Sequence, residues 1–212
     1  MFKQLIILII FVATVIGFNL GHCDAKETDT RQAVNVVFGL DPGPGHYNAV
    51  VGKPRATWNL LDVGQTKLKS LLNAKGQPTD CHLQVSENDG EWGIEGHVGV
   101  YHAYIYHNQQ SVDLQARFKG LASGDYRAYV YAHGDAPNQN AMVELLVGQK
   151  LVARKATAND GTDAYRSMKL KEGLQYVVFE FSKSASEVVR IISHRDGSSY
   201  SMLNAIQIIP VQ

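Results

Sequence analysis

Polar and aromatic side chains alternate along one short segment of the chain. Arg127, Tyr129, Tyr131 and His133 occupy every second position, so they share one face if the segment is an extended strand. Flat tyrosine rings beside arginine and histidine can stack on the apolar face of a sugar ring and hydrogen-bond its hydroxyl groups. A neighbouring loop could instead cover the same face, which would make these rings core residues. The pattern therefore leaves a ligand surface and a packing surface open.

The loop that follows, His133–Asn140, is dense in hydrogen-bonding groups. Loops on a rigid sheet scaffold are where binding residues concentrate. Trp92 follows a turn signal, and we expect it to be exposed, whereas Trp58 precedes two leucines and we expect it in the core. The candidate carbohydrate-binding residues are accordingly Trp92, Tyr129, Tyr131, His133, Asp135 and Asn138.

Metal-binding patterns are incomplete. His97, His102 and His107 are five residues apart, which matches neither a helix face nor a strand face, and no HExxH or CxxC pattern accompanies them. We therefore expect no transition-metal site. The loop carboxylates that could serve a calcium ion, none of them in a complete calcium-binding loop, are Asp41, Asp160 and Asp163.

Catalytic patterns are also weak. The chain has no Gly-x-Ser-x-Gly elbow, and its glycine-rich segment Gly39–Gly45 lacks the Lys-Ser/Thr of a phosphate loop and predicts a turn. Glycosidases need two opposed carboxylates, and a polysaccharide lyase could use tyrosine or histidine as its base. Residues of those types do cluster: Glu87, Asp89, Glu91 and Glu95, then Tyr101, His102, Tyr104 and His107. An enzyme is thus an alternative that rests on residue type alone.

The N-terminus has the pattern of a cleaved secretory signal peptide over residues 1–25. Lys3 precedes an apolar run that ends at Leu20, and cleavage after Ala25 or after Cys23 fits. A lipid-modified Cys23 and an uncleaved anchor are alternatives. No later segment is long and apolar enough to span a bilayer. We expect a secreted, periplasmic or cell-surface protein whose mature chain has no membrane span.

Composition indicates one globular domain that does not bind nucleic acid. Hydrophobic residues make up 45% of the chain, and 20 basic residues balance 20 acidic ones, whereas phosphate binding calls for a basic surface. We expect a polar leader over 26–33 and the domain over 34–212. Within it, Cys81 is expected to be a buried, unreactive residue.

Short apolar runs with a period of two, separated by turn signals such as Gly148-Gln149, fill the domain. No stretch of a dozen residues carries a helical apolar stripe. About ten short strands predict an all-β sandwich or barrel. The clearest runs are Val112–Phe118, Ala141–Val147, Gln175–Phe181, Glu187–His194 and Leu203–Ile209.

Six short motifs in a fixed order carry a resemblance to a known family: Val34–Gly39, Thr57–Leu60, Gly120–Tyr126, Tyr129–Gly134, Glu172–Val177 and Leu203–Ile208. Together they resemble the galactose-binding-domain-like modules of exported bacterial proteins, over nearly the whole chain from Val34. The resemblance implies a jelly-roll β-sandwich of antiparallel strands, carbohydrate binding and, in many such modules, a structural calcium ion. Related modules often read Asn-Gly-Ile-Gln where this chain has Ala205.

These observations predict an exported, non-catalytic module that binds a polysaccharide or cell-surface glycan by aromatic stacking and loop hydrogen bonds. The alternative in another class is a structural or adhesion protein that packs on another envelope protein, and an enzyme comes third. Three polar residues are expected to be structural. The Tyr126 hydroxyl should bond a nearby backbone group, while Asn204 and Gln207, flanking an edge or terminal strand, should pair with backbone.

Overall fold

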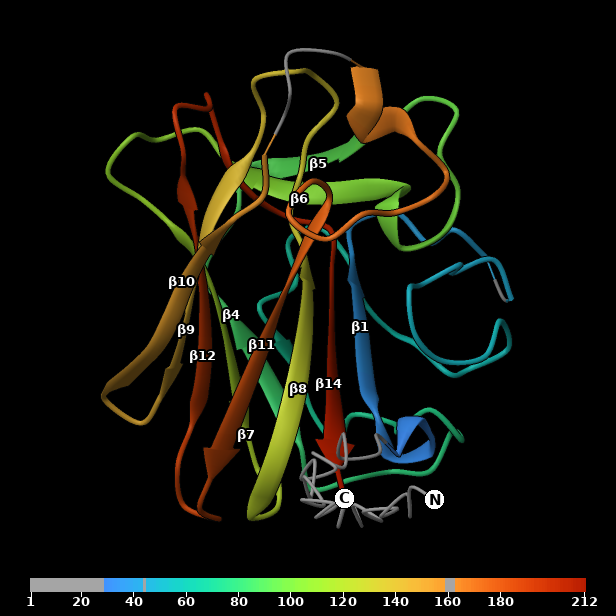
Figure 1. The fold of residues 1–212 in the computed structure, drawn as a ribbon, viewed down its shortest axis with the longest axis vertical. Coiled ribbons are helices and arrows are strands. Elements are labelled where there is room, and N and C mark those ends of the chain that lie inside the picture. Colours follow the sequence, from blue (N-terminus) through green and yellow to red (C-terminus); the bar gives the residue numbers. More distant parts are fainter. Residues whose placement is uncertain (1–28, 44, 159–162) are drawn as a thin grey trace, which may run out of the picture.

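The computed structural model describes residues 29–43, 45–158 and 163–212, which form two β-sheets packed face to face with a smaller third sheet across one end (Figure 1). The expected signal peptide and the first residues of the leader lie outside the described residues. Residues 29–33 of the leader pack against the sandwich, since Asp29 N donates to Pro210 O at 3.0 Å and Ala33 is buried.

The first large sheet, sheet A, has five strands. In spatial order they are β11 (Tyr176–Lys183), β8 (Gly124–Tyr131), β14 (Ala205–Val211), β1 (Val34–Phe38) and β2 (Asn59–Leu61). The opposing sheet B has six strands, β10 (Lys150–Ala156), β9 (Ala141–Val147), β12 (Val189–Arg195), β7 (Leu114–Lys119), β4 (His82–Val85) and β3 (Lys67–Leu68).

The third sheet crosses one end of the sandwich, at the top of Figure 1. It consists of β13 (Ser201–Leu203), β6 (Ala103–His107) and β5 (Gly90–Gly93). The helical segments are single 3-10 turns: η1 (Thr30–Gln32), η2 (Gly99–Tyr101) and η3 (Asp163–Arg166). Residues 101–106, which the sequence left between a helical turn and a strand, are therefore the end of η2 followed by most of β6.

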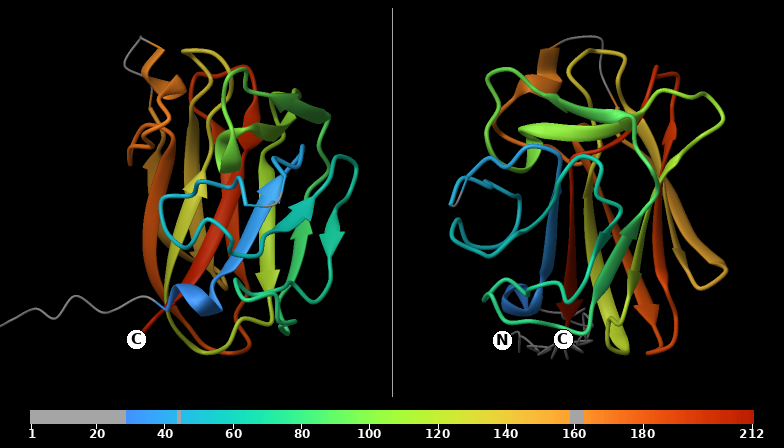
Figure 2. Two further views of the ribbon diagram at one scale, coloured as in Figure 1. Left: turned by 90° about the vertical axis from the view of Figure 1, so that its right-hand side faces the viewer. Right: turned by 180° about the vertical axis from the view of Figure 1, so that it is seen from behind.

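The prediction of an all-β sandwich is confirmed. The described residues form fourteen strands rather than about ten, because several are only two to four residues long. Every strand pair is antiparallel except β1 with β2. From β7 onward the chain passes repeatedly from one large sheet to the other, a connectivity of the jelly-roll kind that both views in Figure 2 let the reader follow.

The core between the sheets consists of side chains at alternate strand positions. Strand β7 shows the pattern clearly: Leu114, Ala116 and Phe118 are buried, and the residues between them are not. They pack against inward side chains of sheet A such as Phe38 and Val130. Cys81 belongs to this core as a free, buried thiol, which confirms the interpretation made from the sequence.

Sheet A also carries a layer of apolar side chains on its outer face. Tyr129, Tyr131 and Tyr176 form it, together with side chains of the connection between β1 and β2. In that connection Tyr47 and Trp58 stack with ring centroids 5.0 Å apart and an interplanar angle of 15°. Trp58 is buried as predicted. The sequence left Tyr131 as either a ligand-binding or a packing residue, and the covering loop buries it, so it is a packing residue.

Three polar residues make the structural bonds expected of them. The Tyr126 hydroxyl donates to Ala122 O at 2.9 Å. Asn204 Nδ2 donates to Ala103 O at 3.0 Å, and Gln207 Nε2 donates to Val51 O at 3.1 Å. Asn204 precedes β14, which contains Gln207 and lies at the centre of sheet A rather than at an edge, so both side chains are buried.

None of the helices among the described residues is long and apolar enough to cross a membrane.

Candidate functional site

An open cleft of 340 Å³ lies at the end of the molecule where the third sheet crosses the sandwich. Three tyrosines, one tryptophan and three polar side chains line it. We call this site the aromatic cleft, defined by Trp92, Tyr104, Tyr106, Asn108, Asp135, Gln139 and Tyr200.

Strands β5 and β6 position the aromatic rings of the cleft. Trp92 on β5 lies directly opposite Tyr104 on β6, so their side chains share one face of the third sheet. Trp92 is 57% exposed, whereas Tyr104 is buried. The Tyr106 ring lies 6.2 Å from that of Tyr104 and 5.3 Å from that of Tyr200. The cleft thus combines the exposed indole ring of Trp92 with three tyrosine rings that pack against one another.

The loop between β8 and β9 supplies two polar side chains to the cleft, Asp135 and Gln139. Gln139 Oε1 accepts from the Tyr104 hydroxyl at 3.2 Å and from Asp135 N at 2.8 Å. Its Nε2 has no partner among the residues that the structure describes, so it can donate to a ligand. The Asp135 carboxylate pairs with Arg166 at 2.7 Å and can accept from a ligand hydroxyl at the same time.

Gly134 makes room for Gln139. A Cβ atom at Gly134 would lie 2.0 Å from Gln139 Oε1 and 2.8 Å from Gln139 Cβ, well inside van der Waals contact. The absence of a side chain at this position is therefore what lets the glutamine amide reach the cleft.

The hydroxyl of Tyr104 stays protonated across the physiological range. Burial raises the pKa of Tyr104 well above its usual value, and this effect outweighs the hydrogen bond to the Asp135 backbone, which lowers the pKa. The neutral hydroxyl donates to Gln139 and orients its amide, so the polar side of the cleft is held in place before any ligand arrives.

Tyr131 and His133 do not reach the surface, which corrects the expectation of a continuous stacking face along β8. Both side chains are 0% exposed. The Tyr131 hydroxyl donates to Gln207 Oε1 at 2.9 Å, and the His133 ring stacks on Tyr165 with centroids 4.9 Å apart. The physical reason is that the loop after β1 and the segment around Tyr165 cover the face that the alternation exposes in an isolated strand.

Tyr129 lies apart from the aromatic cleft. It is 7% exposed and lines a shallow groove of 610 Å³ on the outer face of sheet A, next to Tyr176 and the ion pair between Arg127 and Glu180. Asn138 is exposed in the loop between β8 and β9, without lining the cleft. Of the six predicted residues, the cleft brings together Trp92 and Asp135.

Five residues of the cleft are not among the predicted carbohydrate-binding residues: Tyr104, Tyr106, Asn108, Gln139 and Tyr200. One of these, Tyr104, could have been found. Once residues 90–93 and 103–107 are paired as a hairpin, the register places Tyr104 beside Trp92. Tyr200 joins from a distant part of the chain, and no local pattern marks it.

The groups considered for catalysis do not gather in the cleft. None of the four carboxylates at positions 87, 89, 91 and 95 lines it, and Asp135 is the only carboxylate among its described lining residues. Only Tyr104 lines it among the four residues considered for a lyase, Tyr101, His102, Tyr104 and His107. Tyr101 is buried with its hydroxyl 3.4 Å from Gly134 O, and His102 Nδ1 bonds His97 O at 3.0 Å.

No group of three or more histidine, cysteine, aspartate or glutamate residues among those described is arranged to hold a metal ion. Asp41 Oδ1 is engaged by Gly43 N at 2.9 Å and by the Tyr47 hydroxyl at 3.3 Å. Asp160 and the side chain of Asp163 lie outside the described part of the chain. The residues around Asp41 therefore do not form the calcium site that the resemblance implies.

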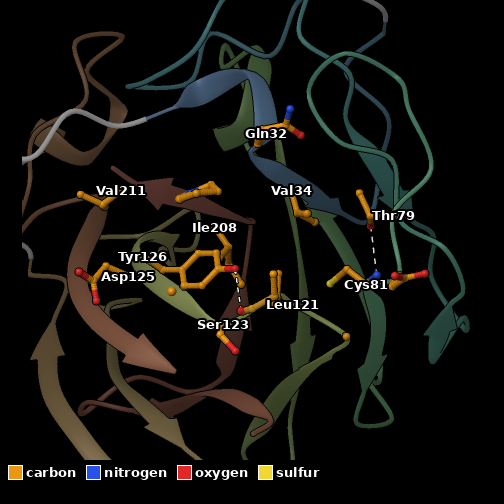
Figure 3. A pocket seen from close by; sticks show the side chains of 15 residues that line it. Gln32, Val34, Thr79, Cys81, Leu121, Ser123, Asp125, Tyr126, Ile208 and Val211 are labelled. Atoms are coloured by element: carbon orange, nitrogen blue, oxygen red, sulfur yellow. Dashed lines mark hydrogen bonds between the residues drawn. The ribbon is translucent and has the colours of Figure 1, made fainter. Parts of the chain in front are cut away.

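A second hollow, of 490 Å³, lies at the opposite end of the sandwich (Figure 3). The Tyr126 ring points into it, and its hydroxyl is engaged by the backbone. Cys81 also lines it, and burial raises the pKa of this thiol to about 12, so it is not a thiolate nucleophile at neutral pH. This hollow offers no exposed aromatic platform among its described lining residues.

No family model matches the sequence, and no curated protein matches it. Among solved structures, the chain is similar to the protein YXIM from Bacillus subtilis, with a TM-score of 0.43 and 10% identity over 84% of this chain. It is also similar to the plant receptor-like kinase ANX2, with a TM-score of 0.45 and 11% identity over 84% of this chain. This chain spans 40% and 47% of the lengths of those two structures.

A family 35 carbohydrate-binding module from Clostridium thermocellum is also among the similar structures. The match has a TM-score of 0.34 and 14% identity, and it covers 61% of this chain and 91% of the module. The solved structures similar to this chain thus include a carbohydrate-binding module. The structure itself defines an all-β sandwich with a third sheet and an aromatic cleft at one end.

Proposed function

We propose that this protein is an exported, non-catalytic module that binds a polysaccharide or cell-surface glycan in the aromatic cleft. The observation that carries the proposal is Trp92, a large aromatic ring 57% exposed at a cleft that also contains polar groups from Asn108, Asp135 and Gln139. Exposing an indole costs free energy in water, which stacking on a sugar ring recovers.

Each part of the cleft has a role in this mechanism. Trp92 stacks on the apolar face of a sugar ring, and Tyr106 and Tyr200 extend the contact to a neighbouring ring. Gln139 Nε2 donates to a sugar hydroxyl and the Asp135 carboxylate accepts from one. Since most of these groups are held by internal bonds, little conformational entropy is lost when the sugar binds.

Affinity electrophoresis through a panel of neutral and acidic polysaccharides tests the proposal. We expect one or more polymers to retard the protein, and Trp92→Ala to lose about tenfold in affinity, since one stacked ring contributes about 1–2 kcal/mol. Leu151→Ala, which removes an exposed apolar side chain on β10 away from the cleft, is the matched control and should bind normally.

Other results would contradict the proposal. If no polymer retards the protein, the structural or adhesion role takes its place. If a polymer becomes shorter during the run, the protein is an enzyme and the non-catalytic role is wrong.

A further inference from the structure

The outer face of sheet B becomes basic toward the edge formed by β3 and β4. Lys67 on β3 lies directly opposite Gln84 on β4. Gln84 lies opposite Arg117 on β7, and Arg117 lies opposite Arg190 on β12. Directly opposite residues share one face of a sheet, so these four side chains form a row across four strands.

A second row lies two residues further along the same strands. His82 on β4 is the partner of Lys119 on β7, and Lys69 follows β3 on the same side. We call the combined surface the basic face, defined by Lys67, Lys69, His82, Arg117, Lys119 and Arg190. All of these but the half-buried Arg190 are exposed. A hollow of 230 Å³ lies among the first five, with Leu68, Leu83 and Gln84 completing its lining.

The positive charge of the basic face is not neutralised. Arg117 donates to the Gln115 amide and Arg190 donates to Gly148 O at 3.0 Å, and none of the lysines or arginines of the face forms an ion pair with any described residue.

Carboxylates do occur on the outer face of sheet B, but further along the strands. There Glu144 pairs with Arg154, and Asp113 bonds His194 at 2.7 Å.

This arrangement costs folding free energy in a chain whose 20 basic residues equal its 20 acidic ones. Two arginines directly opposite each other on antiparallel strands repel, as Arg117 and Arg190 do. A ligand that carries negative charges at a similar spacing relieves that repulsion. The basic face therefore has the chemistry of a site for an anionic polymer.

We propose that the basic face binds a polysaccharide whose sugars carry carboxylate or sulfate groups. Neighbouring strands are about 4.8 Å apart, close to the length of one sugar unit, so two successive charged sugars can meet Arg117 and Arg190, which lie opposite each other on adjacent strands. No phenylalanine, tyrosine or tryptophan lines the hollow among the described residues, so the bases of a single-stranded nucleic acid would find only the small His82 imidazole and the Arg117 guanidinium to stack on. Preferring a polysaccharide to a nucleic acid also rests on the proposed function, whereas the anion site itself does not.

Two pairs of matched polymers test this proposal: polygalacturonate with its methyl ester, and dextran sulfate with dextran. Each is immobilised, and the dissociation constant of the purified protein is measured by biolayer interferometry. We expect at least one acidic polymer to bind more than about tenfold tighter than its neutral twin, and to weaken at least about tenfold between about 50 and 300 mM NaCl as counter-ions are displaced.

Charge reversal locates the site. Arg117→Glu combined with Lys119→Glu should weaken binding to the acidic polymer at least about tenfold at low salt. Lys53→Glu combined with Arg55→Glu is the matched control. It changes the net charge equally, on the loop that covers sheet A, and should bind as the unmodified protein does.

The proposed binding sites, the aromatic cleft and the basic face, can be tested independently of each other. Trp92→Ala should leave the preference for acidic over neutral polymer in place, and the reversal on β7 should leave binding in the cleft intact. Equal affinity for an acidic polymer and its neutral twin in both pairs, an equal loss in the control reversal, or tighter binding to DNA than to either polysaccharide would overturn the proposal.

Discussion

At the scale of single residues, the aromatic cleft depends on contacts between side chains that are distant in sequence. Trp92 and Asp135 could be selected from the sequence because a tryptophan after a turn and a loop rich in polar groups are visible locally. The contribution of Tyr104 becomes visible only once residues 90–93 and 103–107 are paired, and those of Gln139 and Tyr200 depend on contacts with other segments. Burial of Tyr131 and His133 depends on covering loops, which an alternating pattern cannot reveal.

Gly134 gives a prediction at this scale. Gly134→Ala places a Cβ where Gln139 lies and forces its side chain out of the cleft, so we expect binding of the cleft ligand to weaken about tenfold and stability to fall by about 1–3 kcal/mol. The dissociation constant and the free energy of unfolding in urea measure the two effects.

Gly93→Ala is the control for that variant. Its Cβ would lie 3.6 Å from Leu40 Cδ1, an ordinary contact, although the residue is adjacent to Trp92. Unchanged affinity in Gly134→Ala would show that the Gln139 amide takes no part in binding.

At the scale of elements, the alternation of apolar residues predicted the strands well wherever one face meets water. Strand β7 follows that rule, and so does β12 over most of its length. The rule fails for β1, which is buried at all five positions, and for β14. A strand at the centre of sheet A is covered on both faces, and that position follows from the order of the sheet rather than from local sequence.

Gln207 shows what holds this twice-covered sheet together. Its amide accepts from the Tyr131 hydroxyl on β8 and donates to Asn35 Oδ1 on β1 and to Val51 O in the covering loop. Gln207→Leu leaves these buried groups without partners, so we expect it to lower the free energy of unfolding by about 2–4 kcal/mol.

Urea denaturation measures that effect, and Gln84→Leu on the exposed face of β4 is the matched control, with an expected change within about 0.5 kcal/mol. An equal cost in both variants would mean that the bonds of Gln207 contribute nothing specific.

At the scale of the whole molecule, a cluster of buried rings links the cleft to the body of the sandwich. His97 lies edge-on to Tyr101 with ring centroids 5.0 Å apart, and His133 stacks on Tyr165 beside it. Burial lowers the pKa of both histidines, and for His97 the nearby Arg166 lowers it further. The folded protein therefore favours their neutral forms.

This cluster predicts acid sensitivity. Below the unfolded-state pKa of about 6.5 the unfolded chain takes up protons that the folded chain does not, so stability is complete above that pH and falls as the pH decreases toward the folded-state values. We expect a loss of up to about 1.4 kcal/mol per pH unit per histidine. The free energy of unfolding in urea at about pH 7 and about pH 5 measures it.

His133→Phe preserves a ring to stack on Tyr165 but cannot be protonated, so its stability should fall less with acid than that of the unmodified protein. His46→Phe, at an exposed position, should behave like the unmodified protein. An identical pH dependence in His133→Phe and the unmodified protein would remove His133 from the explanation.

The position of β14 also has a consequence for folding during synthesis. This strand follows the other thirteen described strands in the chain, yet it lies between β8 and β1 in sheet A. While a ribosome is still making the chain, β8 has no neighbour on that side, and the inner surface of sheet A stays incomplete. Completion of sheet A therefore waits for residues 205–211, and until then the growing chain exposes apolar surface that the finished sandwich buries.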